Sequence, residues 1–153
     1  NYTSNIQLKT INVQKNDCWR DIFQLNTHNA SIFNLTKKYI YEPNASIMKS
    51  GGFNEVSCQL KIDKLHQNSH LYTSDVLIDF PGRRFEVLHV IPFDKKKLKK
   101  LIPTGKANIT TRNFPQTVAQ IRKKTGLKDG GNQYLFFTTD MNEKHIVIVS
   151  KKV

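Results

Sequence analysis

The chain has 153 residues, which is enough for one ordinary domain or two small ones. Hydrophobic residues make up 38% of it and include nine Phe and five Tyr, a content that argues against wholesale disorder. No run of about 18 apolar residues predicts a membrane span, and no charged and then apolar segment at the start resembles a signal peptide. We therefore expect a cytoplasmic protein with no membrane partner. Because the chain begins at Asn1 without a Met, we expect a piece of a longer protein or a processed form.

The charge is distributed unevenly along the chain. The formal net charge is +12, yet residues 1–80 carry 8 Lys and Arg against 7 Asp and Glu. Residues 81–153 carry 16 Lys and Arg against only 5 Asp and Glu. A neutral half followed by a basic half suggests a polyanionic partner for the second half, because such a field attracts phosphate chains.

The first half shows weak hydrophobic periodicity. We expect strands over residues 6–13, 19–25, 39–41 and 71–73, and a loop or short helix over 26–37. Asn44 is a good N-cap residue, so we expect a helix from it to about Cys58. Gly51 and Gly52 weaken that helix by about 1 kcal/mol each relative to Ala.

The second half is more regular and begins after a turn at Pro81-Gly82, where we place a domain boundary. Residues 84–93 alternate at period two, which predicts a strand with one buried side, and His89 is expected to pack in the core on that side. The apolar residues of that side are Phe85, Val87, Ile91 and Phe93.

Two helices are expected after this strand. Asp94 caps the first, over 95–102, and its narrow apolar face consists of Leu98, Leu101 and Ile102. A strand over 106–113 separates it from the second helix, which begins with a capping box formed by Thr117 and Gln120 and ends at Gly126. Strands over 133–139 and 144–150 then form a hairpin. The fold class is therefore α+β, with a small ferredoxin-like α+β domain over 1–82 and a basic β-α-β-α-β-β domain over 83–153, whose two helices pack on one face of the sheet.

Basic side chains cluster on both of these helices and between them. A helix needs a solvated polar face in any case, but such a face normally mixes both signs of charge. No acid occurs between Lys95 and Lys128, so we favour phosphate binding. The candidate nucleic-acid-binding cations are Lys95, Lys96, Lys97, Lys99, Lys100, Lys106, Arg112, Arg122, Lys123, Lys124 and Lys128.

Arg112, Asn113 and Phe114 add a more specific pattern at the end of a strand. The guanidinium and the amide can bond a phosphate or a base edge, and the ring can stack on a base. Alternatively, Phe114 packs at the start of the following helix and Arg112 is an ordinary surface residue. The sequence leaves both possibilities open.

A catalytic centre is not expected. Gly130-Gly131 follows a helix and precedes a strand, which is the wrong order for a phosphate-binding loop. His66 and His70 are four residues apart, but the residues between them predict a loop and not the helix face that a metal site would need. We expect no catalytic residue, no metal and no cofactor on this chain.

Several motifs along the chain are recognisable as two sets. The first set is Tyr41-Glu42-Pro43-Asn44-Ala45-Ser46-Ile47, His70-Leu71-Tyr72-Thr73-Ser74-Asp75 and Phe80-Pro81-Gly82-Arg83. The second set is Lys106-Ala107-Asn108-Ile109, Arg112-Asn113-Phe114-Pro115, Ile121-Arg122-Lys123-Lys124 and Lys128-Asp129-Gly130-Gly131 through Tyr134-Leu135-Phe136. The first set resembles the ferredoxin-like domain, and the second the THUMP-like domain, that end class I S-adenosylmethionine-dependent methyltransferase-like proteins of the Bacteroidetes type. The similarity covers about residues 39–153.

The resemblance implies a methyltransferase parent whose catalytic Rossmann domain, with its S-adenosylmethionine site, precedes this part of the protein. THUMP-type domains are associated with RNA binding in RNA-modifying enzymes. We therefore expect a module that presents tRNA or rRNA to its own methyltransferase domain. The alternative is a structural or dimerisation module that braces the catalytic domain without binding nucleic acid. A small autonomous enzyme is the least favoured hypothesis.

Overall fold

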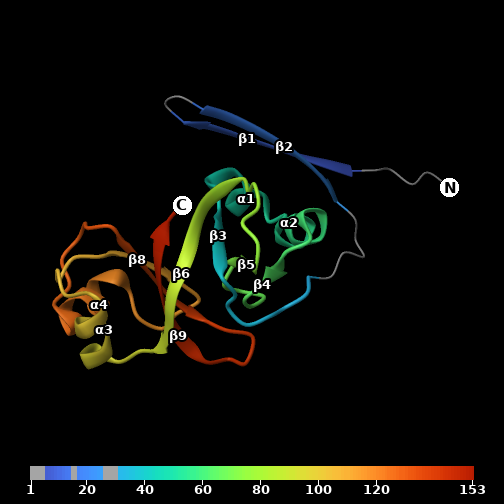
Figure 1. The fold of residues 1–153 in the computed structure, drawn as a ribbon. Helices are drawn as coiled ribbons and strands as arrows, with labels where there is room; N and C mark the ends of the chain where they lie inside the picture. Colours follow the sequence, from blue (N-terminus) through green and yellow to red (C-terminus); the bar gives the residue numbers. More distant parts are fainter. Residues whose placement is uncertain (1–5, 15–16, 26–30) are drawn as a thin grey trace.

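The structure is a computed structural model that describes residues 6–14, 17–25 and 31–153. The first two strands, β1 (Ile6–Gln14) and β2 (Asp17–Leu25), are described as backbone only. They pair antiparallel as a hairpin that lies beside the first two helices and outside the main sheet (Figure 1). Both strands confirm the sequence prediction. Of the expected loop or short helix at 26–37, residues 26–30 lie outside the described residues, and residues 31–37 contain no helix.

One seven-stranded sheet forms the centre of the molecule. Its order is β4-β5-β3-β6-β9-β8-β7, and every neighbouring pair is antiparallel except β7 and β8. The strands are β3 (Tyr39–Pro43), β4 (Asp63–Lys64), β5 (Tyr72–Ser74), β6 (Gly82–Pro92), β7 (Asn108–Arg112), β8 (Gln133–Thr139) and β9 (His145–Lys152). The sequence analysis missed only the two-residue strand β4.

The single helix expected over 44–58 is two helices, α1 (Ala45–Ser50) and α2 (Phe53–Leu60). Asn44 caps α1 as predicted, and its side chain accepts from the backbone amide of Ile47. Gly51 then adopts the left-handed conformation at φ 72°, which terminates α1, and Gly52 begins α2. The two glycines therefore end one helix and start another, which is a larger effect than the weakening predicted from their propensity.

The prediction that 84–93 buries a single side is wrong, because β6 contains a bulge. The register against β9 shifts between Val87 and His89, and an extra residue in a strand reverses which side chains face each side of the sheet. Phe85 therefore packs with one cluster, and Ile91 and Phe93 pack with the cluster under the later helices. His89 pairs with Val149 and is exposed, so it is not the core histidine that the sequence suggested.

The second half has the predicted β-α-β-α-β-β order, with α3 (Lys95–Leu101) between β6 and β7 and α4 (Val118–Thr125) between β7 and β8. Leu98 and Ile102 from the first of these helices and Ile121 from the second are buried in one core, which confirms that both helices cover the same face. The capping box at Thr117 and the left-handed Gly126 are also as predicted.

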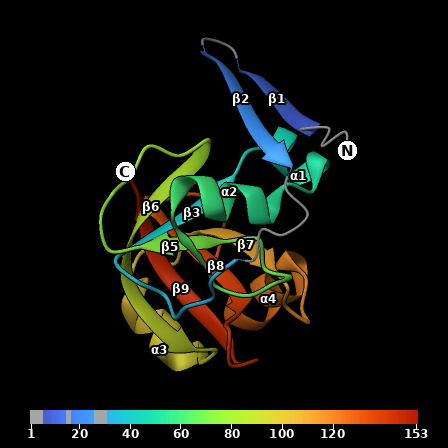
Figure 2. The same ribbon diagram turned by 90° about the vertical axis from the view of Figure 1, so that its right-hand side faces the viewer.

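Side chains alternate between the two faces of the sheet, so each face buries its own core. Helices α1 and α2 lie over β3 and β5 (Figure 2) and pack on Tyr41 and Tyr72. The strand register places this core on the same face as α3 and α4, opposite Phe85. The opposite face, which we call the inner face, buries Phe85, Phe136 and Ile148 under the segment that contains Leu71.

β6 belongs to both halves, because it pairs with β3 at its start and with β9 along the rest. Its first residue, Gly82, has no room for a side chain, since a Cβ there would lie 2.1 Å from the carbonyl oxygen of Glu42. The boundary predicted near residue 82 thus falls within a continuous sheet, and the division into two domains stays a prediction. In the described residues, no helix is long and apolar enough to cross a membrane.

Candidate nucleic-acid interface

The five lysines of α3 occupy the whole outer surface of that helix. Asp94 begins the helix, with its carboxylate accepting from the backbone amides of Lys96 at 2.8 Å and Lys97 at 3.2 Å. These two hydrogen bonds hold the pKa of Asp94 below its ordinary value. Leu98 and Ile102 fix the inner side of the helix in the core, so the remaining positions point to solvent. The exposed residues are Lys95, Lys96, Lys97, Lys99 and Lys100.

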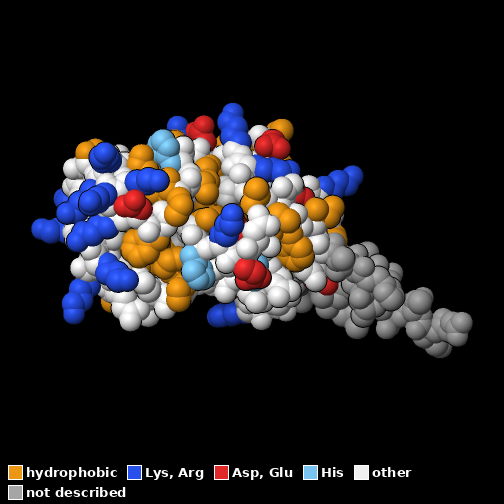
Figure 3. All heavy atoms as spheres, turned by 90° about the horizontal axis from the view of Figure 1, so that it is seen from below, with side chains coloured by type: hydrophobic (Ala, Val, Ile, Leu, Met, Phe, Trp, Pro, Cys, Tyr) orange, Lys and Arg blue, Asp and Glu red, His pale blue; other side chains and the backbone are white. Residues whose placement is uncertain are grey.

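Four more exposed lysines lie on α4 and on the loops beside it. Lys123 and Lys124 occupy the last turn of α4, where cations interact favourably with the helix dipole. Lys106 and Lys128 are brought together by an isolated parallel bridge, in which the Ala107 amide donates to the Lys128 carbonyl at 3.0 Å. Lys and Arg side chains gather at the end of the molecule that carries α3 and α4 (Figure 3).

Arg122 is used inside the protein. Its guanidinium donates to Asp129 at 2.6 Å and to the carbonyls of Leu127 at 3.1 Å and Ala107 at 3.3 Å. These contacts connect the end of α4 with the start of β7. That Arg122 contacts RNA stays a prediction. Its internal hydrogen bonds are sufficient to explain why an arginine occupies this position.

Arg112 has an intramolecular partner across the inner face of the sheet. Its Nη2 lies 2.8 Å from Oε1 of Glu42, whose side chain is only 6% exposed, and Arg83 Nε donates to the other oxygen at 2.6 Å. Three strands lie between β3 and β7 in the sheet order. The pair therefore joins distant strands of the coiled sheet, and Arg112 is not an ordinary surface residue.

Asn113 and Phe114 also make internal contacts. Asn113 has a left-handed backbone at φ 52°, and its amide group lies 3.1 Å from Nδ1 of His66. Phe114 packs on the core under α3 and α4, with its ring edge-on to the rings of Phe93 and Phe137. The packing alternative for Phe114 thus has direct structural support, whereas base contacts by either residue stay a prediction.

One polar feature escaped the sequence analysis. A shallow hollow of about 450 Å³ on α4 is lined by Gln116, Gln120, Lys123 and Lys124. The side-chain oxygen of Gln116 is buried there with no hydrogen-bond partner among the described residues. Gln120, Lys123 and Lys124 lie on α4, but Gln116 precedes the cap residue Thr117, so helical spacing in the sequence does not bring these four residues together.

The two histidines considered for a metal have other partners. His66 bonds Glu143 at 2.7 Å through Nε2, and its Nδ1 accepts from the backbone amide of Asn68 at 3.0 Å. His70 stacks on the ring of Phe53 at 3.7 Å between centroids. Burial, with Lys64 and Arg112 adding to the effect, lowers the pKa of His70 to about 4.

Comparison with known proteins agrees with this architecture. Residues 39–81 match the sequence model of a ferredoxin-like domain, and residues 82–152 match that of the THUMP domain-like family. The chain is thus an α+β protein in which a ferredoxin-like region precedes a THUMP-like one. No curated protein matches it.

A solved structure does match, with a TM-score of 0.87 and 33% identity over 96% of this chain. It is described as the crystal structure of a "putative methyltransferase" from Porphyromonas gingivalis W83. The chain spans 38% of the length of that protein. These matches associate the chain with methyltransferase-like proteins, as the motifs indicated.

Proposed function

We propose that this chain is the RNA-binding part of a class I S-adenosylmethionine-dependent RNA methyltransferase and presents tRNA or rRNA to a catalytic domain elsewhere in the parent protein. One observation carries the proposal. Nine exposed lysines surround α3 and α4, and none of them forms an ion pair with an acid in the described part of the chain. We call these residues the basic face; they are Lys95, Lys96, Lys97, Lys99, Lys100, Lys106, Lys123, Lys124 and Lys128.

The chemistry of the basic face suits phosphate chains more than a folded protein partner. Nine unpaired ammonium groups repel one another, and a polyanion that neutralises them releases its counterions on binding. Lysine contacts with phosphates set position without reading bases. The THUMP-like match over the same residues supports RNA as the polyanion.

Salt dependence of RNA binding tests the proposal. If about four to six lysines contact phosphates, log affinity for single-stranded RNA falls against log salt with a slope near −3 to −4, from about −0.7 per contact. Changing Lys96, Lys97 and Lys100 to Gln should flatten that slope by about two units and weaken binding to every RNA sequence alike. Fluorescence anisotropy over a salt series measures both quantities.

A matched control removes the same charge elsewhere. Changing Lys49, Lys61 and Lys144 to Gln also lowers the net charge by three, but these exposed lysines lie outside the basic face. The control triple should keep the wild-type slope. If the wild-type chain shows no salt-sensitive RNA binding at low ionic strength, the RNA proposal fails and the bracing-module alternative replaces it.

A further inference from the structure

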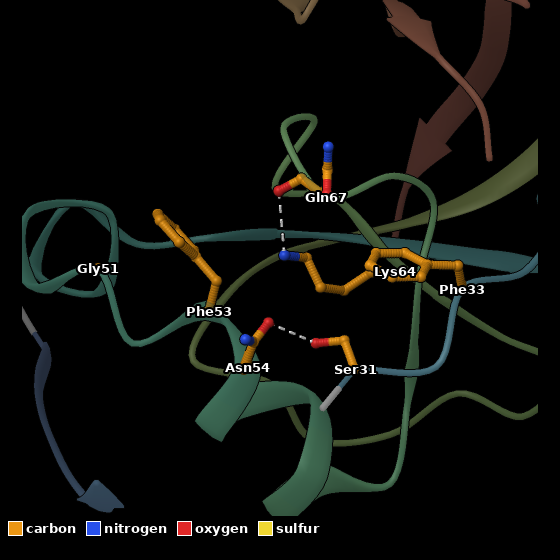
Figure 4. Close-up of a pocket in the computed structure, with 7 residues that line it drawn as sticks. All are labelled: Ser31, Phe33, Gly51, Phe53, Asn54, Lys64 and Gln67. Carbon is orange, nitrogen blue, oxygen red and sulfur yellow. Dashed lines mark hydrogen bonds between the residues drawn. The ribbon is translucent and has the colours of Figure 1, made fainter. Parts of the chain in front are cut away.

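A second basic feature lies on the other half of the chain, in a hollow around Lys64. The hollow measures about 360 Å³, within the size range of small-molecule sites. The segment 31–33, the junction of α1 and α2, and the loop after β4 enclose it (Figure 4). Its lining residues are Ser31, Phe33, Gly51, Phe53, Asn54, Lys64 and Gln67.

Lys64 is an unusual residue to find there, because only 2% of it is exposed. Lys64 is the last residue of β4, and its backbone forms hydrogen bonds with the backbone of Ile32 and Asn34 on the neighbouring segment. Its Nζ donates to the carbonyl of Gln67 at 3.3 Å and forms no ion pair with an acid among the described residues. Burying an ammonium group without a counter-ion costs free energy. Burial accordingly lowers the pKa of Lys64, and the more distant Glu55 carboxylate only partly opposes that effect.

Aromatic rings flank the ammonium group on two sides. Nζ lies 5.6 Å from the ring centre of Phe53 and 6.0 Å from that of Phe33, within the range of cation–π attraction. Phe53 is fixed by its stacking on His70, and 37% of Phe33 is exposed. The hollow thus contains a rigid ring, an accessible ring and a buried cation.

The remaining polar groups of the hollow carry no negative charge. The Asn54 side-chain oxygen accepts from the Ser31 hydroxyl at 2.7 Å, and its amide nitrogen is a donor with no acceptor among the described residues. A second hollow of about 240 Å³ shares Phe33 and Gln67 and continues toward the loop between β8 and β9. A ligand larger than the first hollow therefore has room to extend.

We propose that this hollow is a nucleotide-binding site, in which Lys64 receives the phosphate and the exposed ring of Phe33 stacks on the base. Only one of the three ammonium protons has an acceptor among the described residues, and a phosphate oxygen supplies another together with the missing negative charge. Stacking on an aromatic side chain is the common way in which proteins hold single bases. The nucleotide can be free or part of an RNA strand, and the site does not depend on RNA binding by the basic face.

Uridine 5′-monophosphate, uridine and inorganic phosphate are the probes for this site. Calorimetric titration of the full chain should show the monophosphate binding about tenfold or more tightly than uridine, because a charge-assisted hydrogen bond contributes only when the phosphate is present. Lys64→Met, which keeps the length of the side chain, should abolish that difference. The control Lys49→Met, on the exposed side of α1, should keep it. Phe33→Leu should weaken the monophosphate about fivefold or more without changing the affinity for inorganic phosphate.

A measurement on the unmodified chain guards against misfolding of the Lys64 variant. Lysine NMR should show the pKa of Lys64, which burial lowers from its ordinary value, rising when the monophosphate binds, and a purely structural lysine would not show this. Tighter binding of the trinucleotide UpUpU than of the monophosphate would assign the site to an RNA strand, and the reverse order would assign it to free nucleotides. The proposal is overturned if the monophosphate binds no better than uridine, or if Lys64→Met retains the preference. The two proposals fail separately. If the hollow binds no nucleotide, the salt slope of RNA binding is unaffected, and if the basic face binds no RNA, the affinity for the monophosphate is unaffected.

Discussion

Replacing Arg112 with Met separates a structural role from an RNA-binding role at one residue. The Arg112 guanidinium, 30% exposed, contacts one oxygen of the nearly buried Glu42 at 2.8 Å. A hydrogen bond to a charged group contributes about 1.5–3 kcal/mol, and removing one partner of a fully buried pair costs about 3–5 kcal/mol. Because Arg83 still neutralises Glu42 in the variant, we expect the free energy of unfolding to fall by about 2–3 kcal/mol.

Urea denaturation of four proteins measures this contribution. These are the wild type, Arg112→Met, Glu42→Gln and the double variant, and the cycle isolates the coupling between the two side chains. The control is Arg84→Met, since Arg84 lies 3.9 Å from a largely exposed Asp79, and exposed pairs contribute about 0–1 kcal/mol. The salt slope of RNA binding should not change in Arg112→Met. A loss of stability below about 0.5 kcal/mol together with a slope flattened by about 0.7 would refute this reasoning and make Arg112 a phosphate contact.

Three further substitutions test other parts of the fold. Gly82→Ala places a Cβ against the backbone oxygen of Glu42, so we expect about 2–3 kcal/mol of destabilisation in urea melts. Thr117→Ala removes the side chain that accepts from the Gln120 amide, which should cost about 1 kcal/mol in the same assay. The third concerns pH: His70 has a pKa of about 4 when folded and 6.5 when unfolded, so the unfolded chain binds more protons between those values. Stability should be complete above pH 6.5 and decrease toward pH 4, by at most about 3 kcal/mol from this residue. His70→Gln should reduce that pH dependence, and identical pH profiles for both proteins would contradict the assignment.

Local signals were enough to predict most of the second half. The cap at Asp94, the capping box at Thr117 and the left-handed Gly126 act within one helical turn, so the sequence displays them directly. The exposure of the lysines on α3 followed from the narrow apolar face opposite them. Long-range effects were not visible in this way. The bulge in β6 arises from pairing with β9, and an unbroken alternation in the sequence does not reveal it.

The candidate site shows the same division between local and distant causes. Arg112 looked like a surface residue because its partner Glu42 lies 70 positions earlier in the chain. Lys64 attracted no attention because its burial depends on the 31–33 segment and on Phe53 and Asn54 at the start of α2, which lie ten or more positions earlier in the chain. Only the coiling of the sheet and the packing of these segments give both residues their environments.

The arginines and the lysines of the basic half have different partners, and this difference bears on specificity. The basic half contains four arginines, Arg83, Arg84, Arg112 and Arg122. Each of them forms an ion pair with a carboxylate. The nine lysines of the basic face have no such partner in the described residues. Arginine is the residue that reads bases and phosphates through two parallel hydrogen bonds, whereas lysine acts as a point charge. Under the proposed function, a surface with its arginines already paired would hold an RNA backbone without reading its bases, and any selection of a nucleotide would come from RNA shape or from another site.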